Sequence, residues 1–279
     1  MTIKLEGLED MKRLRRLALK AQGLLQAQPF GVGMSGALQA INHLGYVQLD
    51  TIAVVERAHQ HVLHSRVPEV TSTMTNSLLQ TGAIFEYWSH AAALIPIADY
   101  RYSLPDKLAI KTGQRSWYKN CDHKLMAELL SRINTDGPLR SRDIATHTST
   151  ATSSHISTDT GSNSSTNSST NSSTNSSTNS AWWDWKPAKK ALEQLYMQGD
   201  VMVRERQGFE KTYDLTERVV PAGLDISLPS TDECAQHLLN LQLKCHGAMS
   251  VSGLTYLRKS AAPSHEALSA AANCKPTLA

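Results

Sequence analysis

A polar tract at residues 147–180 separates two stretches of chain that have the composition of folded protein. The tract is almost wholly Ser, Thr and Asn, and it contains the tetrapeptide NSST four times in tandem from Asn163 to Thr178. Such a segment cannot bury enough apolar surface to offset its chain entropy, so we expect it to be disordered. Because lengthening a surface loop adds little closure entropy, the fold can survive this expansion.

The overall composition indicates a soluble protein and permits a nucleic-acid partner without requiring one. The 279 residues are enough for roughly two domains, and the net charge of +3 is mildly basic. The N-terminus has no apolar signal core, and no apolar run is long enough to cross a bilayer. The cysteines are scattered and form no CxxC pair, which argues against a zinc site or a disulfide framework: Cys121, Cys234, Cys245 and Cys274. We expect a cytoplasmic protein that needs no cofactor, no metal and no membrane.

The order of periodic segments predicts a mainly α fold with small β-hairpins, an α+β class made of tandem winged-helix units. In the first unit, residues 1–120, a helical pattern at 11–25 is followed by a helix capped by Ser35 and ended by Gly45. A short strand at 46–50 and helical spacing at 54–66 come next. Helix, helix, then short strand is the order of a winged-helix unit.

A second unit is expected at residues 121–222, interrupted by the polar tract. It contains a helical pattern from Leu125, a helix starting at LRSRDIA, a further helix with Pro187 in its first turn, and a hairpin that turns at Gln207-Gly208. A third unit, residues 223–279, has helical patterns but no wing, and a small polar tail starts at Arg258. We expect this third unit to be incomplete.

The strand at residues 46–50 carries the candidate catalytic pair. Successive side chains of a strand point to opposite faces, so Val47 and Leu49 share one face while Gln48 and Asp50 share the other. An amide beside a carboxylate can hold a water molecule and stabilise a developing positive charge. The alternative interpretation is that both side chains merely solvate the outer face of the strand.

Basic side chains near this strand and in the second unit are candidate phosphate contacts. The segment after the strand contains three histidines, but it lacks a matching carboxylate spacing and an HExxH motif, so phosphate contact or polar surface is favoured over a metal site. The basic hairpin can lie along a phosphate backbone or be an ordinary solvated hairpin. The candidate DNA-binding residues are Arg57, His59, Arg66, Arg140, Arg142, Lys186, Lys189, Arg204, Arg206 and Lys211.

An aromatic segment at residues 81–101 also contains a carboxylate and an imidazole. Glu86 and His90 lie among Phe85, Tyr87 and Trp88, which we expect to form core and an inter-domain seam. A buried carboxylate beside a histidine can do acid–base work, although a hydrogen-bonded structural pair is the more common outcome.

Several blocks of the chain together resemble the winged-helix DNA glycosylases of the AlkZ/YcaQ-like family. These blocks are VQLD followed by VVERAHQHVLHSR, then FEYWSHAAALIP, DGPLRSRD and WWDWKPAKKALEQLYMQGDVMVRERQGFEKTYDLTERVVP. They occur in order over most of residues 10–255. The family signature is Gln, an apolar residue, then Asp or Gln, which corresponds here to Gln48-Leu49-Asp50.

The resemblance implies a DNA repair enzyme of the bacterial cytosol or nucleoid that removes N7-alkylated purines from double-stranded DNA, including purines in interstrand crosslinks. It implies that Asp50 stabilises the oxocarbenium-like sugar and activates water, and that Gln48 positions this water. No obligate protein partner is implied.

Two departures from the family leave alternatives open. The polar tract interrupts the second unit, and the tail after Arg258 does not resemble the family and has the character of a frameshift product. The chain is therefore an active glycosylase, a winged-helix DNA-binding protein without catalysis, or a truncated family member with little activity.

Overall fold

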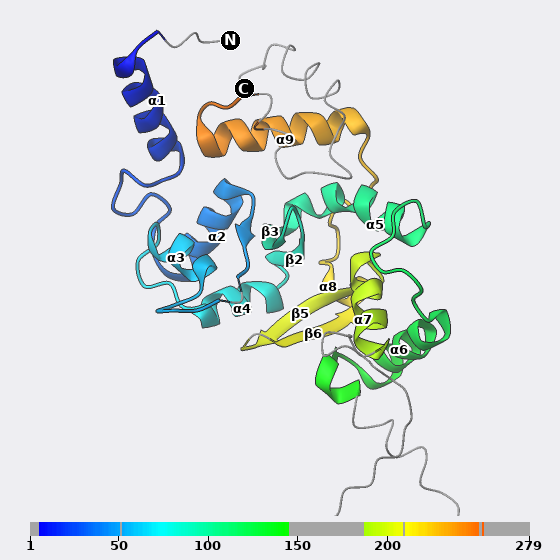
Figure 1. Cartoon of the computed structure of the whole chain (residues 1–279). Coiled ribbons are helices and arrows are strands. Elements are labelled where there is room, and N and C mark those ends of the chain that lie inside the picture. Colours follow the sequence, from blue (N-terminus) through cyan, green and yellow to red (C-terminus); the bar gives the residue numbers. More distant parts are fainter. Residues whose placement is uncertain (1–5, 51, 145–186, 209, 251–252, 254–279) are drawn as a thin grey trace, which may run out of the picture.

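The computed structural model describes residues 6–50, 52–144, 187–208, 210–250 and 253 (Figure 1). The polar tract, for which we predicted disorder, lies outside these residues, as do Lys186 and the tail from residue 254. The described chain consists of helices and two small antiparallel sheets, which confirms the α+β class. None of its described helices is both long and apolar enough to span a bilayer.

The first half of the chain surrounds one three-stranded sheet. Its elements, in order, are α1 (Leu8–Ala21), α2 (Gly33–Leu44), β1 (Val47–Gln48), α3 (Ala58–His64), α4 (Ser72–Gln80), β2 (Ile84–Trp88) and β3 (Ala92–Pro96). The strand order is β1-β3-β2, with Val47 opposite Leu94. The short 3-10 helix η1 (Ile97–Ser103) and α5 (Leu104–Lys111) then lead to the second half.

The second half repeats this topology. Its elements are α6 (His123–Asp136), β4 (Leu139–Arg140), η2 (Ser141–Ile144), α7 (Pro187–Met197), β5 (Val201–Gln207), β6 (Glu210–Leu215) and α8 (Thr216–Val219). The sheet order β4-β6-β5 matches that of the first sheet, because an early short strand again pairs with the second strand of a later hairpin. The two repeats therefore share one sheet topology, and their assignment as winged-helix units stays a prediction.

The hydrophobic core crosses the predicted boundary at residue 120. Strand β2 alternates between two clusters, with Ile84 packed in the core of the first repeat. Phe85 and Tyr87 instead pack with the buried side chains of α6, α7, β5 and β6. The Tyr87 hydroxyl also donates to the Met197 carbonyl oxygen at 2.7 Å. The two repeats thus share one packed seam.

The last described helix, α9 (Thr231–His246), packs back against α1 and α2 (Figure 1). Gln22 Nε2 donates to the Cys245 carbonyl oxygen at 2.8 Å, and Cys245 Sγ lies 3.1 Å from the carbonyl oxygens of His43 and Leu44. A capping box joins Ser230 and Glu233 at the start of the helix. The first element of the predicted third unit is therefore part of the packing of the first repeat.

Several predicted helix limits are wrong. The helix expected at 11–25 ends at Ala21, because Gly23 adopts a left-handed φ of 69°. The second helix begins at Gly33 with Val32, and not Ser35, at the N-cap. The helix expected at 54–66 begins only at Ala58. LRSRDIA starts with strand β4 and continues as a 3-10 helix.

Candidate active site

Strand β1 presents Gln48 and Asp50 on the face that points away from the core. Gly45 ends α2 with a left-handed φ of 75° and turns the chain into the strand. Val47 and Leu49 are buried, whereas Gln48 is exposed and Asp50 is half-buried. Pairing continues past the assigned strand, since the Leu49 N–H donates to the Ala92 carbonyl oxygen at 2.8 Å. The predicted alternation of buried and exposed side chains is confirmed.

The Asp50 carboxylate is oriented by the loop that follows it. Its Oδ1 accepts a hydrogen bond from the Ile52 backbone N–H at 3.0 Å, the local turn that Asp side chains often form. One carboxylate oxygen is thereby held in place, and the carboxylate has a second oxygen to offer to a water molecule.

The loop at residues 52–57 exposes apolar side chains directly beside Asp50. It is closed by an isolated β-bridge between Ala53 and Arg57. Ile52 is 71% exposed, Val54 93% and Val55 90%. Folded proteins rarely leave neighbouring large apolar side chains in water without a binding role. We name residues 52–57 the apolar loop.

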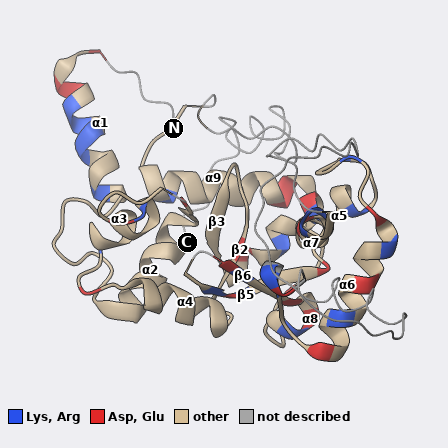
Figure 2. Ribbon diagram, turned by 60° about the horizontal axis from the view of Figure 1, so that its bottom comes forward, with Lys and Arg blue, Asp and Glu red and all other residues tan. Residues whose placement is uncertain are grey.

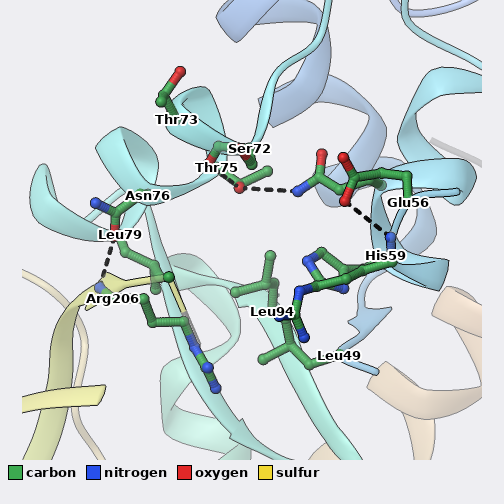
Figure 3. Close-up of a pocket in the computed structure, with 13 residues that line it drawn as sticks. Leu49, Glu56, His59, Ser72, Thr73, Thr75, Asn76, Leu79, Leu94 and Arg206 are labelled. Atoms are coloured by element: carbon green, nitrogen blue, oxygen red, sulfur yellow. Dashed lines mark hydrogen bonds between the residues drawn. The ribbon is translucent and has the colours of Figure 1, made fainter. Parts of the chain in front are cut away.

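A cavity of about 250 Å³ lies behind Leu49, between the first repeat and the β5–β6 hairpin (Figure 3). Leu49, Leu79 and Leu94 form apolar parts of its wall, and His59 and Arg206 also line it. The remaining lining residues are Glu56, Arg57, Gln60, Ser72, Thr73, Thr75, Asn76 and Gly208. We name it the Gln60 cavity.

Three of the candidate DNA-binding residues lie on α3 or next to it, and two of them, His59 and Arg66, are buried. Arg57 is half-buried at the N-cap of the helix, whereas His59 is only 7% exposed. Arg66 differs from the expected phosphate contact, because its guanidinium is buried and donates to the carbonyl oxygens of Gln22 and Val62 at 2.7 and 2.8 Å. Burial lowers the pKa of Arg66. This geometry makes Arg66 a structural link between the ends of α1 and α3.

The basic hairpin neutralises a buried carboxylate instead of presenting all its cations to solvent. Arg206 Nε and Nη2 donate to the two carboxylate oxygens of Glu86 at 2.7 and 2.8 Å, and Lys211 Nζ lies 2.9 Å from the same group. Burial would raise the pKa of the Glu86 carboxyl, but the charges of Lys211 and Arg206 outweigh it and hold that pKa below its ordinary value. Arg204 pairs with Asp214 at 2.9 Å but remains 52% exposed.

The acid–base pair considered for Glu86 and His90 does not form. Glu86 is completely buried against the cations of β5 and β6. The His90 ring packs edge-on against Tyr46, with centroids 5.2 Å apart.

The remaining candidates of the second repeat lie on its surface. Arg140 pairs with Asp143 at 2.8 Å, and Arg142 pairs with Glu210 at 2.8 Å while staying 58% exposed. Lys189 is exposed in the first turn of α7. Lys186 is outside the described residues. These side chains do not surround Gln48 and Asp50; they are spread over the second repeat.

The densest group of exposed cations is on α1 (Figure 2). The helix half-buries its apolar stripe toward α9, and its other faces carry the basic residues Lys12, Arg13, Arg15, Arg16 and Lys20. Among these, Lys12 pairs with Glu9 at 2.8 Å on the surface. A concentrated positive surface of this kind suits contact with phosphates.

Comparison with known proteins decides the family. The family model described as "DNA glycosylase AlkZ-like" matches residues 41–275, which is most of the chain. The chain belongs to the AlkZ-like family. The match begins just before β1 and includes Gln48-Leu49-Asp50, so the family resemblance derived from the sequence is confirmed.

A solved AlkZ structure shows the same fold. Streptomyces sahachiroi DNA glycosylase AlkZ superposes with a TM-score of 0.54 over 92% of this chain, at 15% sequence identity. The AlkZ-like chain spans 63% of the length of that protein.

The sequence did not indicate the Gln60 cavity or the buried ion cluster of Glu86, Arg206 and Lys211. The sequence did mark Glu86 as a carboxylate inside an apolar segment, which signals a buried partner. It could not name Arg206 as that partner, because the two residues are 120 positions apart in the chain.

Proposed function

We propose that this AlkZ-like protein is a monofunctional DNA glycosylase that hydrolyses the N-glycosidic bond of N7-alkylated purines, including purines in interstrand crosslinks. The observation that carries the proposal is the alternation of buried Val47 and Leu49 with exposed Gln48 and half-buried Asp50, in a chain of a DNA glycosylase family. A regulatory DNA-binding protein has no need of a carboxylate and an amide that can hold water at this position.

The proposed chemistry uses the charge that alkylation already places on the base. An N7-alkylated guanine is cationic, so the bond between C1′ and N9 breaks with its electron pair moving to the base, which leaves as a neutral molecule. Asp50 stabilises the oxocarbenium-like sugar, as a carboxylate does in glycoside hydrolysis. Gln48 positions a water whose oxygen bonds to C1′ while Asp50 accepts its proton.

The surroundings of β1 supply contacts that suit a duplex. The apolar loop beside Asp50 exposes Val54 and Val55, and apolar side chains of this kind can enter between base steps and unstack them. The cations of α1 and the exposed guanidinium groups of Arg142 and Arg204 suit phosphate contacts. The buried Arg66 and Arg206 are assigned to the fold and not to DNA.

Base release from a defined duplex tests this proposal. We expect the intact protein to convert a single N7-methylguanine in a duplex into an abasic site, detected by strand cleavage in alkali. Asp50→Ala should reduce the rate by at least about a thousandfold, since it removes the charge that stabilises the transition state, and Gln48→Ala by about a hundredfold. Glu128→Ala, an exposed carboxylate on α6, is the matched control.

The alternatives give different results in the same assay. Salt-sensitive binding of the duplex without base release would identify a DNA-binding protein that lacks catalysis. Neither binding nor release by a cooperatively folded protein would identify a family member that has lost activity.

A further inference from the structure

The cations on the exposed face of α1 have almost no carboxylate partners within the described chain. All five are exposed: Lys12, Arg13, Arg15, Arg16 and Lys20 (Figure 2). Among these five, ion pairing within the described chain is confined to Lys12, which lies 2.8 Å from Glu9. We name these five residues the basic face of α1.

The second repeat treats its arginines differently. Each arginine between α6 and α8 in the described chain lies at most 3.6 Å from a carboxylate oxygen: Arg132, Arg140, Arg142, Arg204, Arg206 and Arg218. Their charge is already balanced within the fold. The basic face of α1 is therefore a concentration of positive charge that the described chain does not neutralise.

The spacing of these cations makes them repel one another. Arg13, Arg16 and Lys20 follow at intervals of three and four residues, which places them in one row along the helix. Like charges at these intervals destabilise a helix. The row is about 10 Å long at the helical rise. Duplex DNA carries one negative charge per about 1.7 Å of its axis, so a row of this length faces several phosphates, which would turn the repulsion into attraction.

The direction of the basic face is fixed by the packing of the opposite side of α1. A Cβ on Gly247, just after α9, would lie 3.0 Å from Leu17 Cγ and 3.4 Å from Ala21 Cβ. At the end of the helix, Arg66 Nε donates to the Gln22 carbonyl oxygen at 2.7 Å. The helix is therefore held by its apolar side and its C-terminal end, so that little orientational freedom is lost when the basic face binds a partner.

Two kinds of phosphate surface can meet a basic helix, namely a nucleic acid and an anionic membrane. A helix that binds a membrane surface buries its apolar side among the lipids. In α1 the apolar side is turned toward α9, and the cations point away from it. This arrangement favours the phosphate backbone of a duplex, which is bound by charge at the surface and needs no apolar insertion.

We infer that the basic face of α1 is an additional DNA contact, which holds backbone phosphates of the duplex outside strand β1. The inference rests on the proposed glycosylase function for the identity of the nucleic acid. Helix α1 precedes residues 41–275, which match the family model, so membership of the family assigns it no role. Contacts of this kind carry no sequence information, so they serve undamaged and alkylated DNA equally.

The salt dependence of binding to an undamaged duplex of 20 base pairs tests this inference. The triple variant Arg13→Gln, Arg16→Gln, Lys20→Gln removes one row of charge and leaves the apolar side intact. Each phosphate contact adds about 0.9 to the slope of log affinity against log salt concentration. We expect fluorescence anisotropy to show a slope smaller by about 2–3 and, at 100 mM salt, an affinity lower by at least about tenfold.

Two control variants separate a local contact from the effect of net charge. The triple variant Lys111→Gln, Lys119→Gln, Lys124→Gln removes the same charge from exposed positions on α5, on α6 and between them. It should keep most of the native slope, and an equal reduction there would overturn the inference. The double variant Arg13→Lys, Arg16→Lys keeps the charge and should bind like the native protein.

Thermal melting checks that each variant folds. If the Gln triple variant does not fold, the single variant Arg16→Gln decides the question, with an expected decrease of about 1 in the slope. A native slope in the folded variants would contradict the contact, as would a native protein that binds no duplex. Tighter binding of the native protein to phosphatidylserine vesicles than to the duplex would also overturn it.

The two proposals can fail separately. Base release together with a native salt slope in the Gln triple variant would leave the glycosylase function intact and remove the DNA contact at α1. Duplex binding that depends on the basic face, in a protein that releases no base, would support the contact and contradict the glycosylase activity.

Discussion

Glu86 is a single residue on which the contact between the two repeats depends. Its carboxylate is completely buried and is compensated by Arg206, which is 9% exposed, and Lys211, which is 22% exposed. Glu86→Gln leaves two cations without their counterion, and removing one partner of a buried ion pair typically costs about 3–5 kcal/mol. We expect urea denaturation to show a loss of about 3 kcal/mol in the free energy of unfolding.

The dependence of this loss on pH gives a second check on Glu86. Because the folded-state pKa is below the ordinary value of 4.5, the stabilisation is complete above that value and disappears as the pH falls through the folded pKa. The difference between native protein and Glu86→Gln should therefore shrink in acid. Glu128→Gln on the exposed face of α6 should show no such difference, and a comparable loss there would contradict the assignment.

Lys107 is a buried cation that the sequence did not single out. Its Nζ lies 3.9, 4.6 and 5.4 Å from the ring centroids of Tyr100, Tyr87 and Phe85 and has no hydrogen-bond partner in the described chain. Burial lowers its pKa from 10.5 to about 7. The unfolded chain therefore binds more protons between these two values, and the stability of the native protein should rise with pH across that window.

Lys107→Met removes this titration. We expect the variant to be more stable than the native protein at about pH 6, by about 2 kcal/mol, and the gap to narrow as the pH rises from about 7 to about 10 in urea denaturation. A variant that is equally destabilised at both pH values would show that the aromatic contacts outweigh desolvation. Lys124→Met, at an exposed position of α6, is the control.

At the scale of one element, the apolar loop connects strand β1 to α3 and exposes two valines. If the apolar loop unstacks the duplex, the double variant Val54→Ser, Val55→Ser should slow base release from a duplex about tenfold. The variant loses the apolar side chains that offset the free-energy cost of unstacking the bases. Single-turnover rates on duplex and on single-stranded substrate measure the effect, and the single-stranded rate should not change.

The control for the loop uses apolar side chains far from β1. Ile226 and Leu228 are 59% and 56% exposed, so Ile226→Ser with Leu228→Ser changes exposed apolar surface by a similar amount. An equal slowing in this control, or equal slowing on both substrates, would show that the loop has no role in opening the duplex.

At the scale of the whole molecule, α9 ties the end of the described chain to the strand that carries Gln48. A Cβ on Gly45 would overlap the two Cδ atoms of Leu241 on α9. Gly45→Ala therefore combines a strained left-handed backbone with displacement of the Leu241 side chain on α9. We expect it to lower the free energy of unfolding by about 1–3 kcal/mol more than backbone strain alone, as measured in urea.

Gly113→Ala separates the two contributions. Gly113 has the same φ of 75°, but a Cβ there meets nothing within 4 Å. Its substitution reports the backbone strain by itself. Equal losses at Gly45 and Gly113 would mean that the Leu241 side chain does not resist a Cβ at Gly45, which would contradict tight packing of α9 at this position.

The sequence predicted those features that depend on neighbouring residues. The period-two alternation at residues 47–50 placed Gln48 and Asp50 on the outer face of a strand, and Gly45 marked the end of the preceding helix. Prediction from local patterns also failed at one place. Val54 and Val55 continued a helical pattern, but the chain forms an exposed loop there. The prediction was wrong because apolar spacing alone does not show whether a partner surface exists.

The amino-acid sequence by itself determined the class of fold, the family, and the strand that carries the candidate catalytic pair, since each is encoded by short-range periodicity or by ordered motifs. Only the tertiary structure decided which charges are available to a ligand. Arg206 is neutralised by Glu86, and Arg66 by carbonyl oxygens of Gln22 and Val62. The physical reason is that desolvation and pairing depend on what lies within a few ångströms, and those partners come from distant parts of the chain.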